Sequence, residues 1–327
     1  MKKAARVSSS YLFLLILLAL LLVAWQKRFS LWDWWRLRGY SPPGAITALA
    51  EQDTMTPAAS HIFYVNHPSL VDQKATFRQD CPTTEQTIVL GCYRSLELGI
   101  YVYNVSDPRL SGVQQVTAAH EMLHGAYDRL SSSDKKYING LLVDYYDHNL
   151  QDQRIQNTMK AYKQTEPGDL VNEMHSVFGT EVANLPAPLE AYYKRYFDNR
   201  QQIVNYSNQY ESVFLDNQNQ IKALDTQIGN LNQQLKIEKQ AIDSEETALG
   251  TERQRLDQLR QSGSVAEYNA AVGPYNSRVE HLRTLIATYN DDVRRINQLI
   301  EQYNQLALLQ DSLIQSIDTR VETRPTQ

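Results

Sequence analysis

The feature that most restricts the fold is a heptad repeat of apolar residues toward the C-terminus. One apolar position recurs every seven residues, at Ile221, Ile228, Leu235, Ile242, Leu249 and Leu256. The pattern breaks at 261–264 and again at Gly273-Pro274, and it resumes from Val279 to Ile317. Two heptad arms around a break predict an antiparallel coiled-coil hairpin over residues 201–320, followed by a disordered tail at 321–327.

Glutamates interrupt the seam of the first arm. Its second apolar position holds Leu224, Leu231 and Leu259 but also Glu238, Glu245 and Glu252. Two interpretations follow from this mixed seam. The hairpin either binds a protein partner or a second copy of the chain, or it is a solvated spacer that contacts only itself.

The N-terminus carries a long apolar run. Residues 11–25 are almost entirely apolar, and with residues 7–10 they make about 19 residues, near the ~20 that a membrane-spanning helix needs. Basic residues flank the run, and Trp32, Trp34 and Trp35 follow it, as is typical of a membrane interface. A cleaved signal peptide is the alternative, but the run lacks a good cleavage site. We expect a transmembrane anchor at 1–28, a juxtamembrane linker at 29–58, and a single-pass membrane protein with its catalytic domain outside the cytoplasm.

The chain has only two cysteines, Cys81 and Cys92. They lack the Cys-x-x-Cys spacing of redox and zinc-ribbon sites, but a short hairpin would bring them together. We predict a disulfide, with two unrelated buried thiols as the alternative. The net charge of −5 excludes the basic field that nucleic-acid binding needs.

Residues 59–200 alternate between strand-like and helical patterns. β-branched and aromatic runs at His61–Val65, Thr87–Leu90 and Gly99–Val105 predict strands. Helices are expected from Gly112 to Arg129, from 131 to 163, and from 169 to 178. Strands followed by helices predict an α+β domain.

The expected helix at 112–129 contains an HExxH motif. His120 and His124 are four residues apart, so one helix face presents both imidazoles to a single metal ion. Glu121 lies beside that face, where a carboxylate can accept a proton from a metal-activated water. These residue types predict a Zn²⁺ site with Glu121 as general base.

A catalytic zinc ion needs a third protein ligand. Glu173 is the first candidate, because it has apolar helical neighbours, and His175 is its rival. Asp128 and Glu181 are further acidic alternatives. Glu173 and His175 are about 200° apart around a helix, so only one of them can face the metal.

The segment Asn172-Glu173-Met174-His175-Ser176 resembles the Asn-Glu-x-x-Ser signature of thermolysin-like gluzincins. That resemblance implies that Glu173 is the third zinc ligand. More broadly, the motifs between residues 45 and 200 resemble those of a group of bacterial membrane-anchored HExxH proteins. The resemblance implies a zincin-like metallopeptidase domain at 59–200, acting on a peptide or protein substrate.

Two functions compete at this stage. The first is a zinc metallopeptidase, in which Tyr127, His175, Tyr192, Tyr193 or Tyr196 would stabilise the developing oxyanion. The second is a non-catalytic assembly protein that acts through its hairpin and keeps a structural metal site. Structural zinc sites are closed by four protein ligands, often cysteines, whereas both cysteines here lie far from the HExxH motif. The sequence therefore favours the enzyme.

Overall fold

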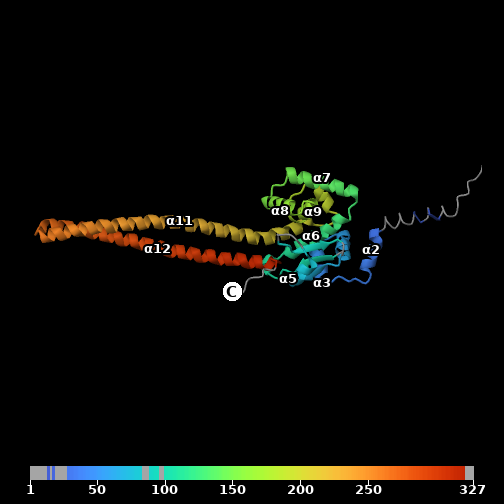
Figure 1. Ribbon diagram of the computed structural model, residues 1–327, viewed down its shortest axis with the longest axis horizontal. Coiled ribbons are helices and arrows are strands. Elements are labelled where there is room, and N and C mark those ends of the chain that lie inside the picture. Colours follow the sequence, from blue (N-terminus) through green and yellow to red (C-terminus); the bar gives the residue numbers. More distant parts are fainter. Residues whose placement is uncertain (1–12, 15–16, 19–27, 83–87, 96–98, 321–327) are drawn as a thin grey trace, which may run out of the picture. The chain divides into compact units, whose positions relative to one another are not determined.

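Helices dominate the chain. The computed structural model describes residues 13–14, 17–18, 28–82, 88–95 and 99–320, and about 77% of these residues are helical. In chain order the elements are α2 (Arg28–Leu37), α3 (Gly44–Gln52), α4 (Pro57–Val65), β1 (Ser69–Val71), α5 (Lys74–Asp80), β2 (Gly91–Arg94), β3 (Gly99–Tyr103), the 3-10 helix η1 (Pro108–Leu110), α6 (Val113–Asp128), α7 (Ser132–His148), α8 (Gln153–Thr165), α9 (Leu170–Glu181), α10 (Ala187–Tyr193), α11 (Arg200–Gln261) and α12 (Val265–Ile317) (Figure 1). They form two compact units, Met1–Glu211 together with Ser316–Gln327, and Ser212–Gln315.

The first unit contains a small mixed sheet with the order β1-β3-β2. β1 runs parallel to β3, and β2 runs antiparallel to β3. The central strand is the most buried, since Ile100 and Val102 are completely enclosed. β2 therefore lies at an edge of the sheet, with one side of its backbone not paired within the sheet.

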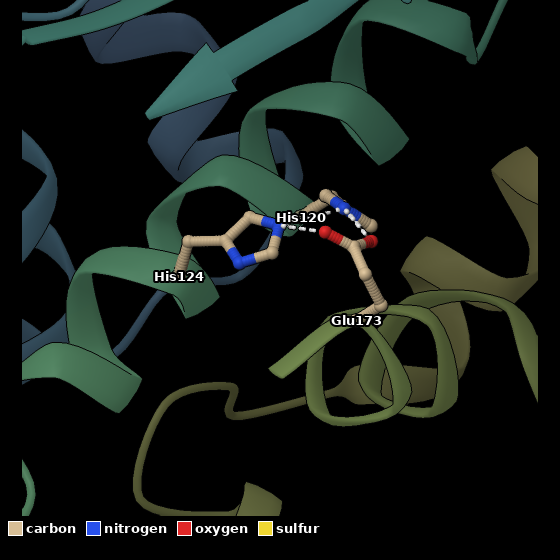
Figure 2. Close-up of side chains that lie close together, drawn as sticks. All are labelled: His120, His124 and Glu173. Carbon is tan, nitrogen blue, oxygen red and sulfur yellow. Dashed lines mark hydrogen bonds and ion pairs between the residues drawn. The ribbon is translucent and has the colours of Figure 1, made fainter. Parts of the chain in front are cut away.

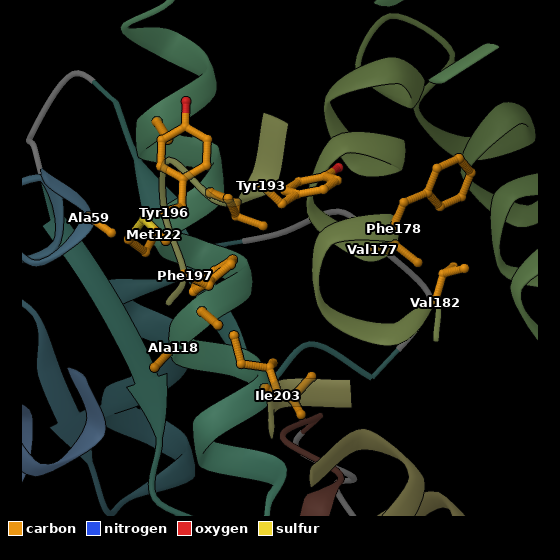
Figure 3. Packing of buried hydrophobic residues seen from close by; sticks show 14 of the residues in the cluster. Ala59, Ala118, Met122, Val177, Phe178, Val182, Tyr193, Tyr196, Phe197 and Ile203 are labelled. Atoms are coloured by element: carbon orange, nitrogen blue, oxygen red, sulfur yellow. The ribbon is translucent and has the colours of Figure 1, made fainter. Parts of the chain in front are cut away.

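Helix α6 forms the centre of this unit. It contacts the sheet through β2 and β3, and it also contacts α9, α3 and α4. Small and apolar residues cover most of its circumference, which is the pattern of a helix enclosed by neighbours. Met122 and Ala118 of α6 lie in the same buried cluster as Val177 and Phe178 of α9 (Figure 3). This packing fixes the face of α9 that meets the HExxH helix.

The predicted α+β zincin-like fold is wrong. The sheet has three strands of only three, four and five residues, and the rest of the described regular structure is helical. The expected strand at His61–Val65 is part of α4, which begins at an N-cap where the Thr56 hydroxyl accepts from the Ala59 amide. A five-residue apolar run suits either a strand or a buried helix, and the cap decides for the helix.

Two of the other expected elements are confirmed. The run at Gly99–Val105 contains β3, and the expected HExxH helix is α6. The helix expected over 131–163 is two helices, because Asp152 starts α8 by accepting from the Arg154 and Ile155 amides. The expected linker interval contains α3, whose Ile46 and Leu49 are buried in the core.

The predicted membrane anchor finds no support. In the described ranges, no helix combines the length and the apolar character that crossing a membrane requires. Most of the predicted span at 7–25, and the whole tail at 321–327, lie outside the described residues. The predicted single-pass membrane localisation is corrected accordingly.

The second unit is an antiparallel helical pair. α11 and α12 run side by side and are joined at Gly263, whose φ of 77° lies in the left-handed region that glycine adopts without strain (Figure 1). The Ser264 amide donates to the Leu259 carbonyl across this turn, as in a Schellman cap. The helical pair reverses at this turn, and Pro274 lies inside α12.

Two of the three seam glutamates, Glu245 and Glu252, share one partner on the facing helix. The Arg278 guanidinium binds both carboxylate oxygens of Glu245, at 2.9 and 3.0 Å, and lies 3.6 Å from Glu252. Buried apolar residues such as Leu231, Ile242 and Leu249 form other layers of the seam. The mixed seam therefore combines apolar layers with charge pairing.

Candidate metal centre

Two histidines on α6 converge on one point. The helical spacing of four residues places His120 and His124 one turn apart, and their Nε2 atoms are 3.0 Å from each other (Figure 2). The neighbouring turns of α6 are packed on the sheet and on α9, so the helix that carries both rings is held on several sides.

Glu173 reaches the same point from α9. Its Oε1 lies 3.4 Å from His124 Nε2, and its Oε2 lies 3.6 Å from His120 Nε2 (Figure 2). Burial alone would raise the pKa of this carboxyl. The nearby His124 and His120 imidazoles, together with a hydrogen bond from Tyr162, outweigh burial and lower the pKa to about 2. Glu173 is therefore an ionised carboxylate that is only 7% exposed.

The three side chains fit a metal ion. With one ligand atom taken from each residue, the three atoms all lie within 4.8 Å of one another. Glu173 Oε2 is buried and accepts no hydrogen bond. A buried carboxylate oxygen in this state is costly unless a cation compensates it. His120, His124 and Glu173 could thus hold a metal ion, and they form the one such group among the described residues.

The alternative third ligands do not belong to the group formed by the two histidines and Glu173. His175 is completely buried on the opposite side of α9, where its Nε2 is 2.9 Å from the Tyr192 hydroxyl. Glu181 pairs with Arg154 at 2.5 Å, and Asp128 accepts a hydrogen bond from Tyr93. The rotation of about 200° expected between positions 173 and 175 explains why only Glu173 faces the histidines.

Glu121 is buried against β2. Its side chain contacts the backbone of Gly91, where an added Cβ would lie 2.6 Å from Glu121 Oε1 and 2.5 Å from Thr117 Cγ2. Only a glycine lets the edge strand approach α6 so closely. Glu121 and Thr117 line the same cleft as the three candidate ligands.

The cleft that contains these residues has a volume of about 680 Å³. Its lining comes from α6, from β2 and the residues that flank it, from α8, α9 and the turn between them, and from Tyr210 of α11. The lining includes His120, Glu121, His124, Tyr162 and Glu173, and residues 90–95 along the strand. A chain segment lying in this cleft would therefore contact both the candidate metal site and the edge of the sheet.

The predicted disulfide is present. Cys81 ends α5, Cys92 lies in β2, and their Cα atoms are 5.8 Å apart. The bond ties the edge strand to α5 beside the cleft. Because both sulfurs are used in this bond, neither cysteine is available as a metal thiolate.

The aromatic residues expected to stabilise an oxyanion do not line the cleft. Tyr192 and Tyr193 are buried around His175, with the Tyr193 hydroxyl donating to the His175 carbonyl at 2.7 Å. Tyr196 belongs to the same cluster, and the Tyr127 hydroxyl donates to Asn139. These four tyrosines and His175 therefore pack in the core or next to it, outside the lining of the cleft.

Tyr162 was not among the predicted site residues, but it lines the cleft and hydrogen-bonds to Glu173. A signal for it exists in the sequence. Ile155 and Met159, the buried residues of α8, precede Tyr162 by seven and three positions, so all three lie on the face of α8 that packs toward α9.

Comparisons with known proteins give no relative. No family model matches this chain, and no curated protein or solved structure matches it either.

Proposed function

We propose that the protein is a zinc-dependent peptidase whose active site is the cleft between β2 and α9. One observation carries the proposal: two histidines and one carboxylate converge in an open cleft that a further buried glutamate also lines. Three protein ligands from nitrogen and oxygen donors are typical of catalytic zinc sites, which keep one position open.

The residues divide the chemistry between them. A bound Zn²⁺ supplies Lewis-acid polarisation of a carbonyl and lowers the pKa of water toward neutrality. Glu121 accepts the proton of the attacking water and passes it to the leaving amine. Glu173 and the two imidazoles hold the metal, and Tyr162 orients the Glu173 carboxylate through its hydrogen bond.

The edge strand favours a peptide as substrate. β2 lies at the edge of the sheet and its residues line the cleft, so an extended chain bound there would lie beside this strand. Pairing with a strand edge uses the amides and carbonyls that every peptide carries. This geometry supports a substrate in extended conformation, with the scissile carbonyl near the three ligands.

A purely structural metal site is less consistent with the geometry. Structural zinc sites are closed by a fourth protein ligand. The two cysteines near the cleft are joined in a disulfide, and Glu181 is paired with Arg154. Among the described residues, no fourth His, Cys, Asp or Glu belongs to the group of three.

The test is Glu121→Gln in the full chain. The amide fills the same space but cannot accept a proton, so zinc content should stay near that of the native protein, while peptide hydrolysis should fall by at least about 1,000-fold. Metal analysis and turnover of a fluorogenic peptide library measure the two effects. Glu51→Gln, an exposed substitution on α3, is the matched control and should change neither. Unchanged hydrolysis in Glu121→Gln would exclude the general-base role.

A further inference from the structure

The segment 316–320 returns to the unit that holds the candidate metal site. It belongs to the first compact unit, although α11 and α12 separate it in the sequence from the other residues of that unit. The Ser316 hydroxyl donates to Asp107 Oδ2 at 3.1 Å. Asp107 is the N-cap residue of η1, the element that precedes the HExxH helix α6. Side-chain contacts therefore attach this late segment to the first unit.

Thr319 makes the contact of this segment that reaches the cleft. Its hydroxyl donates to the Val89 carbonyl at 2.8 Å, at a sequence separation of 230. Thr319 is only 4% exposed, and a buried hydrogen bond of this kind is costly to lose because its acceptor then lies away from water. Val89 lines the cleft, whereas Thr319 does not. Thr319 therefore acts on the cleft through Val89.

Val89 belongs to a continuous stretch of the cleft lining. Residues 88–95 all line the cleft. The carbonyl of the next residue, Leu90, accepts from an amide of β3 at 2.8 Å, which holds the stretch to the sheet. Gly91 follows, and a Cβ added there would lie 2.6 Å from Glu121 Oε1. The bond from Thr319 is thus only two residues away from the close contact between this stretch and Glu121.

Different parts of the chain hold the two ends of this stretch. Toward its C-terminal end, Cys92 is joined to Cys81, and the Arg94 guanidinium donates to the Asp80 carbonyl at 3.1 Å. Both contacts connect the stretch to the end of α5. Thr319 supplies the corresponding connection toward the N-terminal end. The position of the stretch in the cleft therefore depends on both connections.

We propose that Thr319 is a positioning residue that fixes the cleft wall formed by residues 88–91, and with it the way an extended substrate lies in the cleft. The inference rests on the proposed peptidase function and adds a residue to it. Glu121 and the metal ligands belong to α6 and α9, whereas Thr319 bonds to the residues before β2. Loss of this bond should therefore weaken substrate binding more than it slows the chemical step or weakens zinc binding.

Hydrogen exchange tests the positioning directly in the full chain. Thr319→Val keeps the shape of the side chain but removes the hydroxyl, so the amides of residues 88–95 should exchange about tenfold faster while those of α9 stay unchanged. Thr319→Ser retains the donor and should restore most of the protection. Thr288→Val is the matched control and should change nothing here, because the exposed Thr288 hydroxyl donates to the Thr284 carbonyl within α12.

Kinetics test the consequence for the substrate. With a fluorogenic peptide, Thr319→Val should raise KM about fivefold while kcat changes by less than about twofold, and zinc affinity should stay native. Thr319→Ser and the control should keep a KM close to that of the native protein. A merely structural role would instead lower the unfolding temperature and reduce kcat and zinc content together.

The outcomes separate the two proposals. Unchanged exchange of residues 88–95 in Thr319→Val, no recovery in Thr319→Ser, or faster exchange throughout the first unit overturns the positioning role. Faster local exchange with a native KM also overturns it. If the native protein cleaves no peptide, the peptidase proposal fails, and the exchange pattern then decides by itself whether Thr319 positions this wall.

Discussion

The unit that holds the candidate metal ligands and the helical pair of the second unit bury their residues in different ways. In α6, eleven of 16 residues are buried, including polar ones such as Glu121 and His124. In α12, only Ile296 and Leu313 of 53 residues are buried. An enclosed helix has a specific neighbour for nearly every side chain, whereas the paired helices need only a repeating apolar position. We therefore expect substitutions in the first unit to be far more costly than similar ones in the second.

Charged side chains are also more deeply buried in the first unit than in the second. Arg200 in the first unit is 6% exposed and donates to the Val182 and Ala183 carbonyls at the end of α9 as well as to Glu190. Arg278 in the second unit pairs with Glu245 while 41% of its side chain is exposed. A buried cation that satisfies carbonyls at a helix end fixes that helix, whereas water can replace an exposed pair.

The largest expected effect is the loss of metal affinity in Glu173→Ala. Removing a direct ligand should weaken zinc binding by more than about 100-fold, beyond what loss of a supporting residue costs. Competition with a chelating dye measures the affinity. Glu238 is the comparison in the helical pair, because it too has a buried carboxylate oxygen without a partner. Glu238→Leu should leave zinc binding unchanged and stabilise the seam.

His175→Gln sharpens this first prediction. The residue is two positions from Glu173 but packs among Tyr192, Tyr193 and Tyr196, so its replacement should lower the unfolding temperature and spare zinc affinity. A variant that stays folded but no longer binds zinc would show that His175, not Glu173, is the third ligand.

The second prediction concerns the two arginines. Arg200→Met leaves the Glu190 carboxylate and three carbonyls without their donor and should cost roughly 3–5 kcal/mol of unfolding free energy. Arg278→Met should hardly change the unfolding midpoint, because the pair that it breaks is exposed to water. Chemical denaturation of both variants measures the contrast. Equal destabilisation would refute the proposed difference between the units.

The third prediction concerns the disulfide. The bond closes a short loop, since its cysteines have a sequence separation of 11, so Cys81→Ser with Cys92→Ser should cost up to about 3 kcal/mol in the chain-entropy estimate. In the native protein both thiols should resist alkylation until a reductant is added, as mass spectrometry can show. Ready labelling of both cysteines without reductant would contradict the bond.

The sequence predicted the site better than the fold. Spacing alone places His120 and His124 on one helix face, and the geometry of an α-helix separates Glu173 from His175, so these relations hold in any fold that keeps the helices. The location of Tyr162 beside Glu173 depends on how α8 and α9 pack. No local pattern encodes that packing.

The wrong predictions about the fold also concern features that depend on tertiary packing. The run His61–Val65 has the composition of a strand, but the Thr56 cap and the burial of Phe63 make it a helix. β1 is only three residues long and depends on its pairing with β3, since Ser69 has its partner at Tyr101. Short elements are determined by tertiary contacts, whereas the long heptad pattern of α11 and α12 carries enough repeats to be visible in the sequence.

The last and smallest prediction compares two glycines. An added Cβ at Gly91 would lie 2.5 Å from Thr117 and 2.6 Å from Glu121, whereas at Gly250 in α11 it would meet nothing within 4 Å. Gly91→Ala should therefore cost about 1–3 kcal/mol through overpacking, and Gly250→Ala should gain about 1 kcal/mol through helix propensity. Because the clash at Gly91 displaces Glu121 rather than a metal ligand, hydrolysis should fall more than zinc affinity does. Parallel measurements of denaturation, zinc binding and peptide turnover check the pair. A Gly91→Ala variant with native stability and turnover would show that the close approach of β2 to α6 is not needed.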